Sequence, residues 1–249
     1  MKATPSPQQL KHEKQLAAEA ALRWVRSGML LGLGSGSTAA LFISQLGAAV
    51  RAGQYQIQAV ATSLASEALA REAGIPLVEP RRGMRLDLTV DGADELNTEL
   101  QLVKGGGGAL LREKVLATAA DYLLILADST KLVPQLGRFP LPLEVVPFAL
   151  PWILDAVAEL EGKPVVRMSR QQPTEPARTD QGNLLVDCHF QSIPDATSLA
   201  RHLQQIPGLV EHGLFLGLAR AALVAQGEQV LVYTPGAEPQ SLPGFSAFP

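Results

Sequence analysis

Hydrophobic positions at the start of the chain follow a helical spacing. Residues 8–26 place Leu16, Ala20 and Trp24 four positions apart, which predicts an amphipathic helix. Gly28 follows this segment and is a typical helix stop. The chain is therefore expected to begin with a helix that packs one face against a core.

Short apolar runs then alternate with further helical segments as far as residue 136. Expected strands cover residues 29–33, 57–61, 76–78, 86–90 and 122–127, and expected helices cover residues 39–50, 63–73 and 110–120. Repeated alternation of strand and helix is typical of a mainly parallel sheet with helices on both faces. We therefore expect a main unit of the α/β class.

A different order of elements begins after the Pro-rich segment 139–142. Expected strands cover 144–146, 165–168, 184–187 and the region of Leu209, and expected helices cover 151–160 and 197–205. This order indicates a smaller α+β (ferredoxin-like) unit. We assign it to residues 137–211, inserted in a main unit of residues 1–136 and 212–249.

The last part of the chain is expected to return to the main sheet. Two apolar segments, 214–218 and 229–233, are interpreted as the returning strands. The Pro- and Gly-rich tail after Thr234 is expected to be a loosely packed end.

Composition narrows the class of protein. The 249 residues carry a formal net charge of −3, which argues against a protein whose main task is to bind nucleic acid. Cys188 is the single cysteine, which excludes an intrachain disulfide and a cysteine-based metal cluster. Residues 1–14 lack the apolar core of a signal peptide, and the apolar stretches are too short to span a bilayer. We expect a cytoplasmic protein without a membrane or nucleic-acid partner.

Polar, glycine-rich segments follow three of the expected strands. These segments are 34–38, 91–95 and 128–131. Because ligands of parallel α/β sheets bind beyond the carboxyl ends of the strands, the three segments are expected to share one rim.

The loop from Gly34 to Thr38 precedes a helix and supports two interpretations. Its exposed amides and hydroxyls could bind a phosphate at the positive end of the helix dipole. It could equally be a strand–helix turn capped by Ser37 or Thr38. The loop lacks the ending of a P-loop, and Ala39 stands at the last position of a G-x-G-x-x-G pattern, so a dinucleotide site also stays open.

Two acids and a glycine run carry the next candidate chemistry. Asp91 and Asp94 could cap a turn, or hydrogen-bond sugar hydroxyls and exchange protons with them. Lys104 precedes four consecutive glycines, 105–108. That run could be a flexible linker, but a cation followed by free amides suits the stabilisation of an oxyanion, and we favour this function.

Glu113 lies early in the helix expected at 110–120. It shares an apolar stripe with Leu116 and Ala117, and burial of a carboxyl group favours a base that works near neutral pH. A first-turn glutamate that complements the helix dipole is the alternative, and the helix pattern alone favours this structural role. Lys114 is expected to be solvated. Lys131 is interpreted as a surface lysine or a second phosphate contact. The histidines show no metal or triad spacing.

Several phrases, taken in order, resemble ribose-5-phosphate isomerase of the A type. They are Gly32–Thr38, Asp91–Asn97, Lys104–Gly107, Leu111–Lys114 and Ala127–Lys131, with extensions through Phe139–Val145 and Gly182–Asp187. Ser35 stands where the family often has Thr, and Gly108 lengthens the glycine run. The resemblance covers nearly the whole chain except its two ends.

The resemblance implies interconversion of D-ribose 5-phosphate and D-ribulose 5-phosphate through an enediolate, in the non-oxidative pentose phosphate pathway. It implies no metal and no organic cofactor, and it implies a homodimer. Glu113 would be the base that moves a proton between C2 and C1. Asp91 would assist ring opening or hydroxyl proton transfer, and Asp94 would hold sugar hydroxyls.

The same resemblance supplies the remaining site residues. The residues that would stabilise the enediolate oxygen are Lys104 and the amides of Gly105, Gly106 and Gly107, and those that would bind the sugar phosphate are Ser35, Gly36, Ser37, Thr38, Gly92, Ala93 and Lys131, aided by Lys14. Two rivals are a CoA-transferase with a glutamate nucleophile and a non-enzymatic sugar-phosphate sensor. The phosphate-type loop argues against the first, and the absence of a basic helix-turn-helix segment argues against the second.

Overall fold

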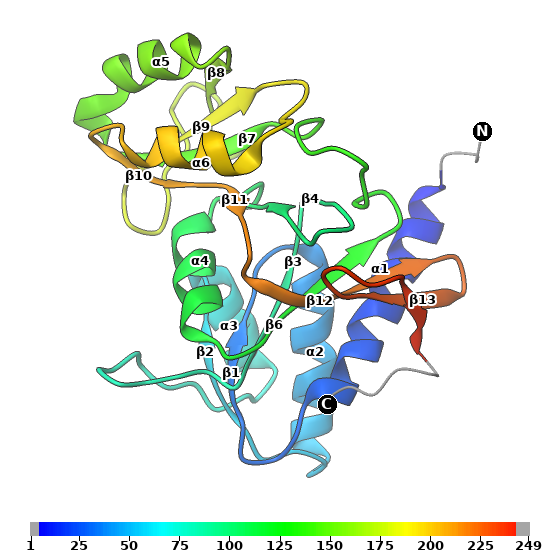
Figure 1. Cartoon of the computed structure of the whole chain (residues 1–249). Helices are drawn as coiled ribbons and strands as arrows, with labels where there is room; N and C mark the ends of the chain where they lie inside the picture. The colour runs from blue at the N-terminus through cyan, green and yellow to red at the C-terminus, as the bar shows by residue number, and fades with distance from the viewer. Residues whose placement is uncertain (1–4, 243–249) are drawn as a thin grey trace.

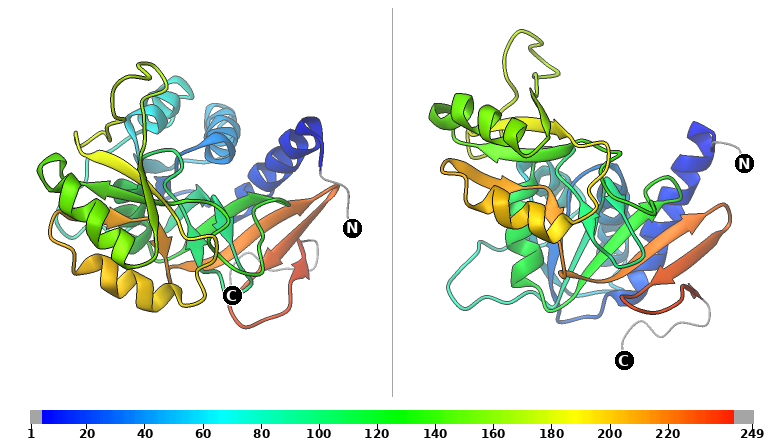
Figure 2. Two further views of the ribbon diagram at one scale, coloured as in Figure 1. Left: turned by 90° about the horizontal axis from the view of Figure 1, so that it is seen from above. Right: turned by 45° about the horizontal axis from the view of Figure 1, so that its top comes forward.

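The computed structural model describes residues 5–242. Figure 1 shows a large twisted sheet with helices packed against it, and a smaller unit of helices and strands above it. Figure 2 shows from two further directions that the smaller unit stays on one side of the large sheet. Among the described residues, no helix is long and apolar enough to cross a membrane. The expectation for residues 1–4 lies outside the described part.

The main sheet has seven strands. Their order is β14 (Gln240–Ser241), β13 (Gln229–Tyr233), β12 (Ala219–Gln226), β6 (Leu123–Asp128), β3 (Leu88–Gly92), β1 (Leu30–Leu33) and β2 (Gln58–Ala61). The strands from β12 to β2 pair in parallel, while β13 and β14 are antiparallel. This confirms the mainly parallel sheet expected from the sequence.

Both faces of the main sheet are covered, as β6 shows. Leu124 and Leu126 join the core on one face, whereas Leu123, Ile125 and Ala127 join the core on the other. Alternate residues of a strand point to opposite faces, so a strand buried on both faces reads as a continuous apolar run. The first face carries α1 (Pro7–Ala21), α2 (Ser37–Arg51) and α3 (Leu64–Glu72), and the second carries α4 (Leu110–Ala119).

The smaller unit has the element order that the sequence predicts. The elements are β7 (Leu141–Val145), α5 (Leu150–Glu159), β8 (Lys163–Val166), β9 (Leu184–His189), α6 (Ala196–Gln204) and β10 (Leu209–His212), with a short helix η2 (Pro147–Ala149) before α5. The strands form an antiparallel sheet in the order β10-β7-β9-β8. This is the ferredoxin-like arrangement.

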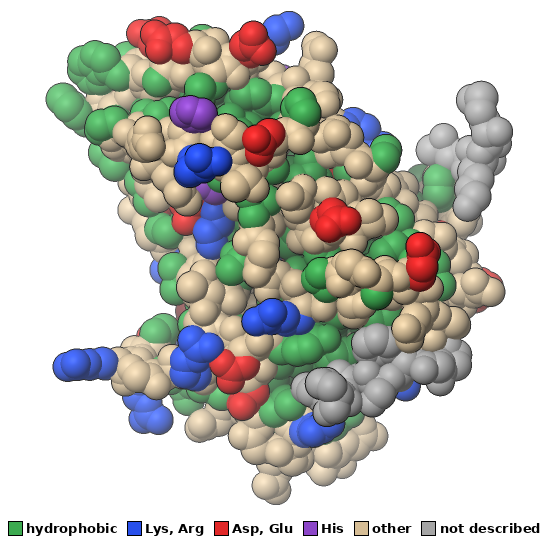
Figure 3. Space-filling model, viewed as in Figure 1, with side chains coloured by type: hydrophobic (Ala, Val, Ile, Leu, Met, Phe, Trp, Pro, Cys, Tyr) green, Lys and Arg blue, Asp and Glu red, His purple; other side chains and the backbone are tan. Residues whose placement is uncertain are grey.

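The surface of the smaller unit carries exposed aromatic side chains. Phe148 is 82% exposed and Trp152 is 63% exposed, and their ring centroids lie 5.6 Å apart. Figure 3 shows hydrophobic side chains gathered over α5, while charges of both signs are scattered across the rest of this face.

A third, three-stranded sheet was not expected. It consists of β11 (Leu214–Phe215), β5 (Leu102–Val103) and β4 (Glu95–Leu96). The prediction that segment 214–218 returns to the main sheet is therefore wrong. The returning strand is β12, which sequence reasoning missed because its Ala-rich segment resembles a helix and its parallel pairing with β6 is a long-range contact.

Three smaller expectations also need correction. The first helix was expected to reach residue 26, but it ends at Ala21. A short 3₁₀ helix, η1 (Leu22–Trp24), follows it, and the backbone of Val25 is extended. Segment 76–78 forms one bridge, between Leu77 and Ala59, and is not a strand. The tail is not wholly loose, because Gln240–Ser241 forms β14, and residues 243–249 lie outside the described part.

Candidate active site

Three strand ends meet beside one small cavity. The cavity has a volume of about 90 Å³, and its lining consists of Lys14, Ser35, Gly36, Ser37, Thr38, Gly92, Ala93, Asp94, Lys104, Gly105, Gly107, Glu113 and Lys131. Most of these residues lie at or just after the ends of β1, β3 and β6, in the first turns of α2 and α4, or in the glycine run before α4, and Lys14 comes from α1. The expectation of one shared rim is confirmed.

A buried lysine between two carboxylates forms the wall of this cavity. Lys104 Nζ lies 2.9 Å from Asp91 Oδ2 and 3.3 Å from Glu113 Oε2, and it donates to Gly92 O at 2.7 Å. All three charged side chains are at most 4% exposed. Buried charges of this kind are stable only when they are paired, so the three groups hold one another in place.

The ionisation of this cluster follows from burial and charge. Burial raises the pKa of Asp91 to about 7, although Lys104 opposes the shift. Burial alone would lower the pKa of Lys104, but the carboxylates of Asp91 and Glu113 outweigh it and hold that pKa above its ordinary value. Lys104 is therefore a fixed cation, and Asp91 is a carboxyl group able to exchange a proton near neutral pH.

Asp91 is fixed by backbone amides as well. Its Oδ1 accepts from Ser35 N at 3.0 Å and from Gly92 N at 2.7 Å. A Cβ atom at Gly34 would lie 2.1 Å from that oxygen and 2.6 Å from the Asp91 Cα atom. The first glycine of the 34–38 loop is thus required because β3 approaches it so closely.

The N-terminus of α2 opens onto the cavity. Gly36 is the N-cap residue, with a φ of 88°, and no side chain caps the helix. Ser37 is the first helical residue, so the interpretation in which Ser37 or Thr38 caps the turn is wrong. Ser66 Oγ donates to Gly34 O at 2.7 Å and braces the loop. The free helix end is suited to an anion.

Lys14 reaches the same helix end from α1. Its Nζ donates to Ser37 Oγ at 3.1 Å and lies 3.9 Å from Asp128 Oδ2. The adjacent Glu13 is fully buried: it accepts from Ser129 N at 2.9 Å and from Gly227 N at 2.8 Å. Sequence reasoning gave Lys14 only a supporting part and missed Glu13, whose backbone partners Ser129 and Gly227 lie more than one hundred positions away.

The glycine run curls around Asp94. Gly106 N donates to Asp94 Oδ2 at 2.7 Å, and a Cβ atom at Gly106 would lie 2.6 Å from Asp94 Oδ1. Gly105 and Gly108 have φ values of 101° and 85°, which favour glycine. Burial raises the pKa of Asp94, although the Gly106 amide and nearby lysines oppose it. The run is an ordered turn, which contradicts its interpretation as a flexible linker.

Glu113 lies in the first turn of α4 and points into the cavity. Its Oε1 accepts a short hydrogen bond from Ser35 Oγ, and its side chain is 4% exposed. The first-turn position suits the helix dipole, but the contacts with Ser35 and Lys104 show that it also belongs to the cavity. Glu113 therefore lies both at the helix start and in the cavity, and its role as a base stays a prediction.

Two neighbours of these motifs face away from the cavity. Glu95 is buried and accepts from Gly137 N at 2.8 Å and Phe139 N at 2.7 Å, which anchors the crossing into β7. Lys114 was expected to be solvated, but it is largely buried and pairs with Glu211 Oε1 at 2.6 Å. That expectation is wrong because β10 packs against α4.

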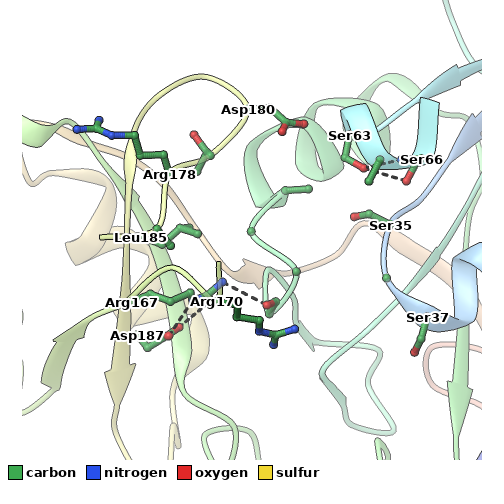
Figure 4. A pocket seen from close by; sticks show the side chains of 18 of the residues that line it. Ser35, Ser37, Ser63, Ser66, Arg167, Arg170, Arg178, Asp180, Leu185 and Asp187 are labelled. Carbon is green, nitrogen blue, oxygen red and sulfur yellow. Dashed lines mark hydrogen bonds and ion pairs between the residues drawn. The ribbon is translucent and has the colours of Figure 1, made fainter. Parts of the chain in front are cut away.

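A second, wider cavity lies between the smaller unit and the main sheet. Its volume is about 740 Å³, and it shares Ser35, Gly36, Ser37 and Gly107 with the small cavity. Figure 4 shows Arg170 extending from the smaller unit toward the side on which Ser37 lies, with Arg167 beside Asp187 on the same wall. Sequence reasoning did not predict this cleft or its arginines.

In residues 5–242, no group of three or more His, Cys, Asp and Glu side chains could hold a metal ion. Cys188 is fully buried, and burial raises the pKa of its thiol to about 12.

Comparison with sequence families gives one matching model. Residues 58–229 match the family model described as ribose 5-phosphate isomerase A (phosphoriboisomerase A). A curated relative from Nitrobacter hamburgensis, named ribose-5-phosphate isomerase A, is 50% identical over 226 residues, which cover 88% of this chain and 96% of the relative. A relative of the same name from Sphingopyxis alaskensis is 46% identical over 220 residues, covering 88% and 95%.

Solved structures agree with the sequence comparison. Ribose 5-phosphate isomerase A from Methanocaldococcus jannaschii superposes with a TM-score of 0.85 at 38% identity, covering 92% of this chain and all of the other. A D-ribose-5-phosphate isomerase in complex with phospho-erythronic acid gives a TM-score of 0.88 at 35% identity, covering 90% and 99%. These values show similarity over nearly the whole fold.

Proposed function

Because this chain belongs to the ribose 5-phosphate isomerase A family, we propose that its small cavity interconverts D-ribose 5-phosphate and D-ribulose 5-phosphate through an enediolate. The chain is an aldose–ketose isomerase of ribose 5-phosphate. The proposal concerns which residues perform the reaction and how.

Glu113 is the base. Its carboxylate removes the proton from C2 of the open-chain aldose, the C2–H electrons form the C1–C2 double bond, and the carbonyl oxygen on C1 becomes negative. The carboxyl group then returns the proton to C1, while a hydroxyl proton leaves O2 and the ketone forms. The single observation that carries this assignment is the buried Glu113 carboxylate, 3.3 Å from Lys104 in a cavity lined with amides.

Lys104 and the glycine run stabilise the enediolate. The ammonium group is buried and fixed between two carboxylates, so its charge acts in a region of low dielectric constant. The amides of Gly105, Gly106 and Gly107 add dipoles that need no reorganisation during the reaction.

The two aspartates handle the hydroxyl groups. Asp91, with its pKa raised by burial, moves the proton between O1 and O2 and assists ring opening. Asp94 is fixed by Gly106 N and holds sugar hydroxyls at the mouth of the cavity, beside Gly92 and Ala93.

The phosphate group occupies the uncapped end of α2. Ser35, Gly36, Ser37 and Thr38 offer amides and hydroxyls, and Lys14 and Lys131 line the same cavity. An anion at a helix N-terminus is stabilised by the dipole and by free N–H groups.

A charge-removing substitution tests the assignment of the base. We expect Glu113→Gln to fold normally and to bind ribose 5-phosphate, but to lose turnover by a factor of about 10² to 10⁴ or more. Glu67→Gln is the matched control, since Glu67 is also a first-turn acid but pairs with Arg71 outside the small cavity. Near wild-type turnover by Glu113→Gln would rule out the assignment.

Four further points belong to the same proposal and rest mainly on the resemblance. Residues 137–211 form an inserted domain, and residues 1–136 and 212–249 form the catalytic domain; the separate sheet of β7–β10 supports this division. The reaction needs no metal or organic cofactor, which turnover in the presence of a chelator tests. The protein is a cytoplasmic homodimer, which fractionation and sedimentation test.

A further inference from the structure

One arginine of the smaller unit forms hydrogen bonds with the glycine run. Arg167, directly after β8, directs Nη1 to Gly105 O at 3.1 Å and to Gly106 O at 3.2 Å. The rest of its guanidinium group is held by Asp187 of β9, which accepts from Nε at 2.8 Å and also from Nη2. The two side chains are 18% and 23% exposed. A half-buried bidentate pair thus extends from the smaller unit to the candidate active site.

These contacts fix the direction of two peptide groups. In a trans peptide the C=O group and the following N–H group point in opposite directions. The peptide between Gly105 and Gly106 is held at both edges, by Arg167 on its oxygen and by Asp94 on its N–H group, which is 2.7 Å from Oδ2. The next peptide is held by Arg167 at Gly106 O, so the N–H group of Gly107 points away from Arg167.

Gly107 lines the small cavity as well as the wide one. An N–H group of Gly107 that points away from Arg167 and into the small cavity would face the side on which the enediolate oxygen forms. Glycine peptides rotate readily because glycine lacks a Cβ atom. If the 106–107 peptide turned over, the cavity would receive a carbonyl oxygen in place of an N–H donor, and that oxygen would repel the developing negative charge.

We propose that Arg167, oriented by Asp187, is a positioning residue that keeps the Gly106–Gly107 peptide turned so that its N–H group donates to the enediolate. This inference deepens the proposed function and rests on it. It assigns a mechanistic role to the smaller unit, which has no other described side chain bonded to the glycine run.

The chemistry of the pair explains why an arginine and an aspartate stand there. A guanidinium group is planar and can bind a carboxylate through two N–H groups while a third reaches the carbonyl oxygens. Its positive charge also polarises the two peptides and strengthens their N–H groups as donors. A lysine has one compact ammonium group and cannot make both sets of contacts in this geometry.

Removal of the guanidinium group gives the first test. We expect Arg167→Met to lower kcat by a factor of about 10 to 10². Removal of one oxyanion-hole donor lowers kcat by a factor of about 10² to 10³, and Arg167 acts on such a donor without contacting the oxyanion itself. KM should change less than kcat. Arg170→Met is the matched control: Arg170 lines the same cleft but forms no hydrogen bond or ion pair with the described residues, and its kcat should stay within twofold of wild type.

Two ligands separate positioning from a general loosening of the site. Phospho-erythronic acid carries a carboxylate that stands in for the enediolate oxygens, whereas inorganic phosphate probes only the end of α2. We expect Arg167→Met to lower the affinity for phospho-erythronic acid by a factor similar to the loss in kcat/KM. The affinity for inorganic phosphate should stay within twofold of wild type. Equal weakening of both ligands, or a kcat equal to that of Arg170→Met, would overturn the inference.

A double variant guards against failure to fold. Arg167→Met leaves Asp187 partly buried without its partner, so Arg167→Met/Asp187→Asn removes both charges together. We expect the double variant to lose as much kcat as Arg167→Met alone, since Asp187 acts only through Arg167. A double variant with wild-type kcat would contradict the inference.

The outcome also separates this inference from the proposed function. If wild-type protein does not isomerise ribose 5-phosphate, the proposed function fails. If wild type is active and Glu113→Gln is inactive, but Arg167→Met keeps wild-type kcat and analogue affinity, only the role of Arg167 fails.

Discussion

The two cavities of this protein differ in size and in how their charges are held. The small cavity has a volume of about 90 Å³, and buried Lys104 in its wall contacts the buried carboxylates of Asp91 and Glu113 and the Gly92 carbonyl. The wide cleft has a volume of about 740 Å³, but Arg170 and Arg178 at its wall are exposed. Chemistry of the enediolate type needs fixed, desolvated charge, so the smaller cavity is the better catalytic site.

The small cavity and the wide cleft differ because different elements of the fold form their walls. Asp91 stands in β3 at the centre of the main sheet, and Glu113 stands in the first turn of α4. Much of the cleft wall comes from the loop between β8 and β9. Groups on packed strands and helices keep their positions, whereas loop residues at a surface are more mobile. Substitutions in the small cavity should therefore cost more than substitutions in the cleft.

The largest effect on stability is expected from Lys104→Met. The substitution leaves Asp91 and Glu113 as buried carboxylates without their cation, which should lower the free energy of unfolding by about 3 to 5 kcal/mol. It also removes the charge beside the enediolate, which should lower kcat by a factor of about 10² to 10³. Urea unfolding and steady-state kinetics measure the two losses.

Lys131→Met is the control for stability in that experiment. Lys131 lines the same cavity but is only half-buried. Lys131→Met should therefore change the free energy of unfolding of the protein by less than about 1 kcal/mol. A Lys104→Met protein as stable as Lys131→Met would show that the buried cluster is not held by its charges.

A pH-dependent loss of stability is expected from His212, which lies behind α4. Burial, followed by the charge of Lys114, lowers the pKa of His212 to about 4, although Glu211 opposes the shift. Its Nδ1 atom accepts from Leu214 N at 3.3 Å, which favours the neutral ring. The unfolded chain takes up a proton near pH 6.5.

The stability that this histidine contributes is therefore complete above pH 6.5 and is lost as the pH falls from 6.5 toward 4. The loss should be on the order of 3 kcal/mol, at about 1.4 kcal/mol for each pKa unit. His212→Gln should show a flatter pH profile of unfolding than wild type, whereas His202→Gln, at an exposed site, should not. Parallel profiles for wild type and His212→Gln would refute this prediction.

A clash within the glycine run should have an intermediate effect. A Cβ atom at Gly106 would lie 2.6 Å from Asp94 Oδ1, so Gly106→Ala must displace the Asp94 side chain. We expect kcat/KM to fall by a factor of about 10 to 10², as catalytic groups tolerate little misplacement. The assay is steady-state turnover of ribose 5-phosphate.

Gly107→Ala controls for the effect of an added methyl group on stability. No atom lies within 4 Å of a Cβ atom at Gly107, so the melting temperature should not change. If Gly106→Ala kept the wild-type kcat/KM, Asp94 would not need its present position.

The smallest effect is expected at the cleft. Asp180 Oδ2 accepts from Leu64 N, at the start of α3, at a distance of 2.8 Å. Asp180→Ala should lower the free energy of unfolding by about 1 kcal/mol, as the loss of a helix cap does, which corresponds to about 2 to 4 °C in Tm. Glu175 is an exposed acid of the same loop, and substitutions at exposed sites usually have small effects. Glu175→Ala should therefore change Tm by less than about 1 °C. A larger loss of kcat for Asp180→Ala than for Gly106→Ala would reverse the ranking of the two cavities.

The sequence predicts the rim of the small cavity well because the relevant signals are local. Gly34, Asp91 and Lys104 each stand in a short phrase at a strand end or in a turn, and the rule for parallel sheets brings strand ends together. The resemblance to a family then assigns Glu113, for which the helix pattern alone favoured a structural role.

The sequence predicts long-range contacts less well. Arg167 contacts Asp187 and Gly105, which are 20 and 62 positions away, and no local pattern marks those pairs. Strand β12 is Ala-rich, and its state is decided by pairing with β6 rather than by propensity. The wide cleft is likewise absent from the sequence because it depends on how the smaller unit packs against the main sheet.

A crystal structure of this protein with phospho-erythronic acid would test most directly which cavity is catalytic. We expect the phosphate group at the Ser35–Thr38 end of α2, and the carboxylate within hydrogen-bonding distance of Lys104 Nζ and facing Glu113. A ligand bound among Arg170 and Arg178, with the small cavity empty, would contradict the assignment of the active site.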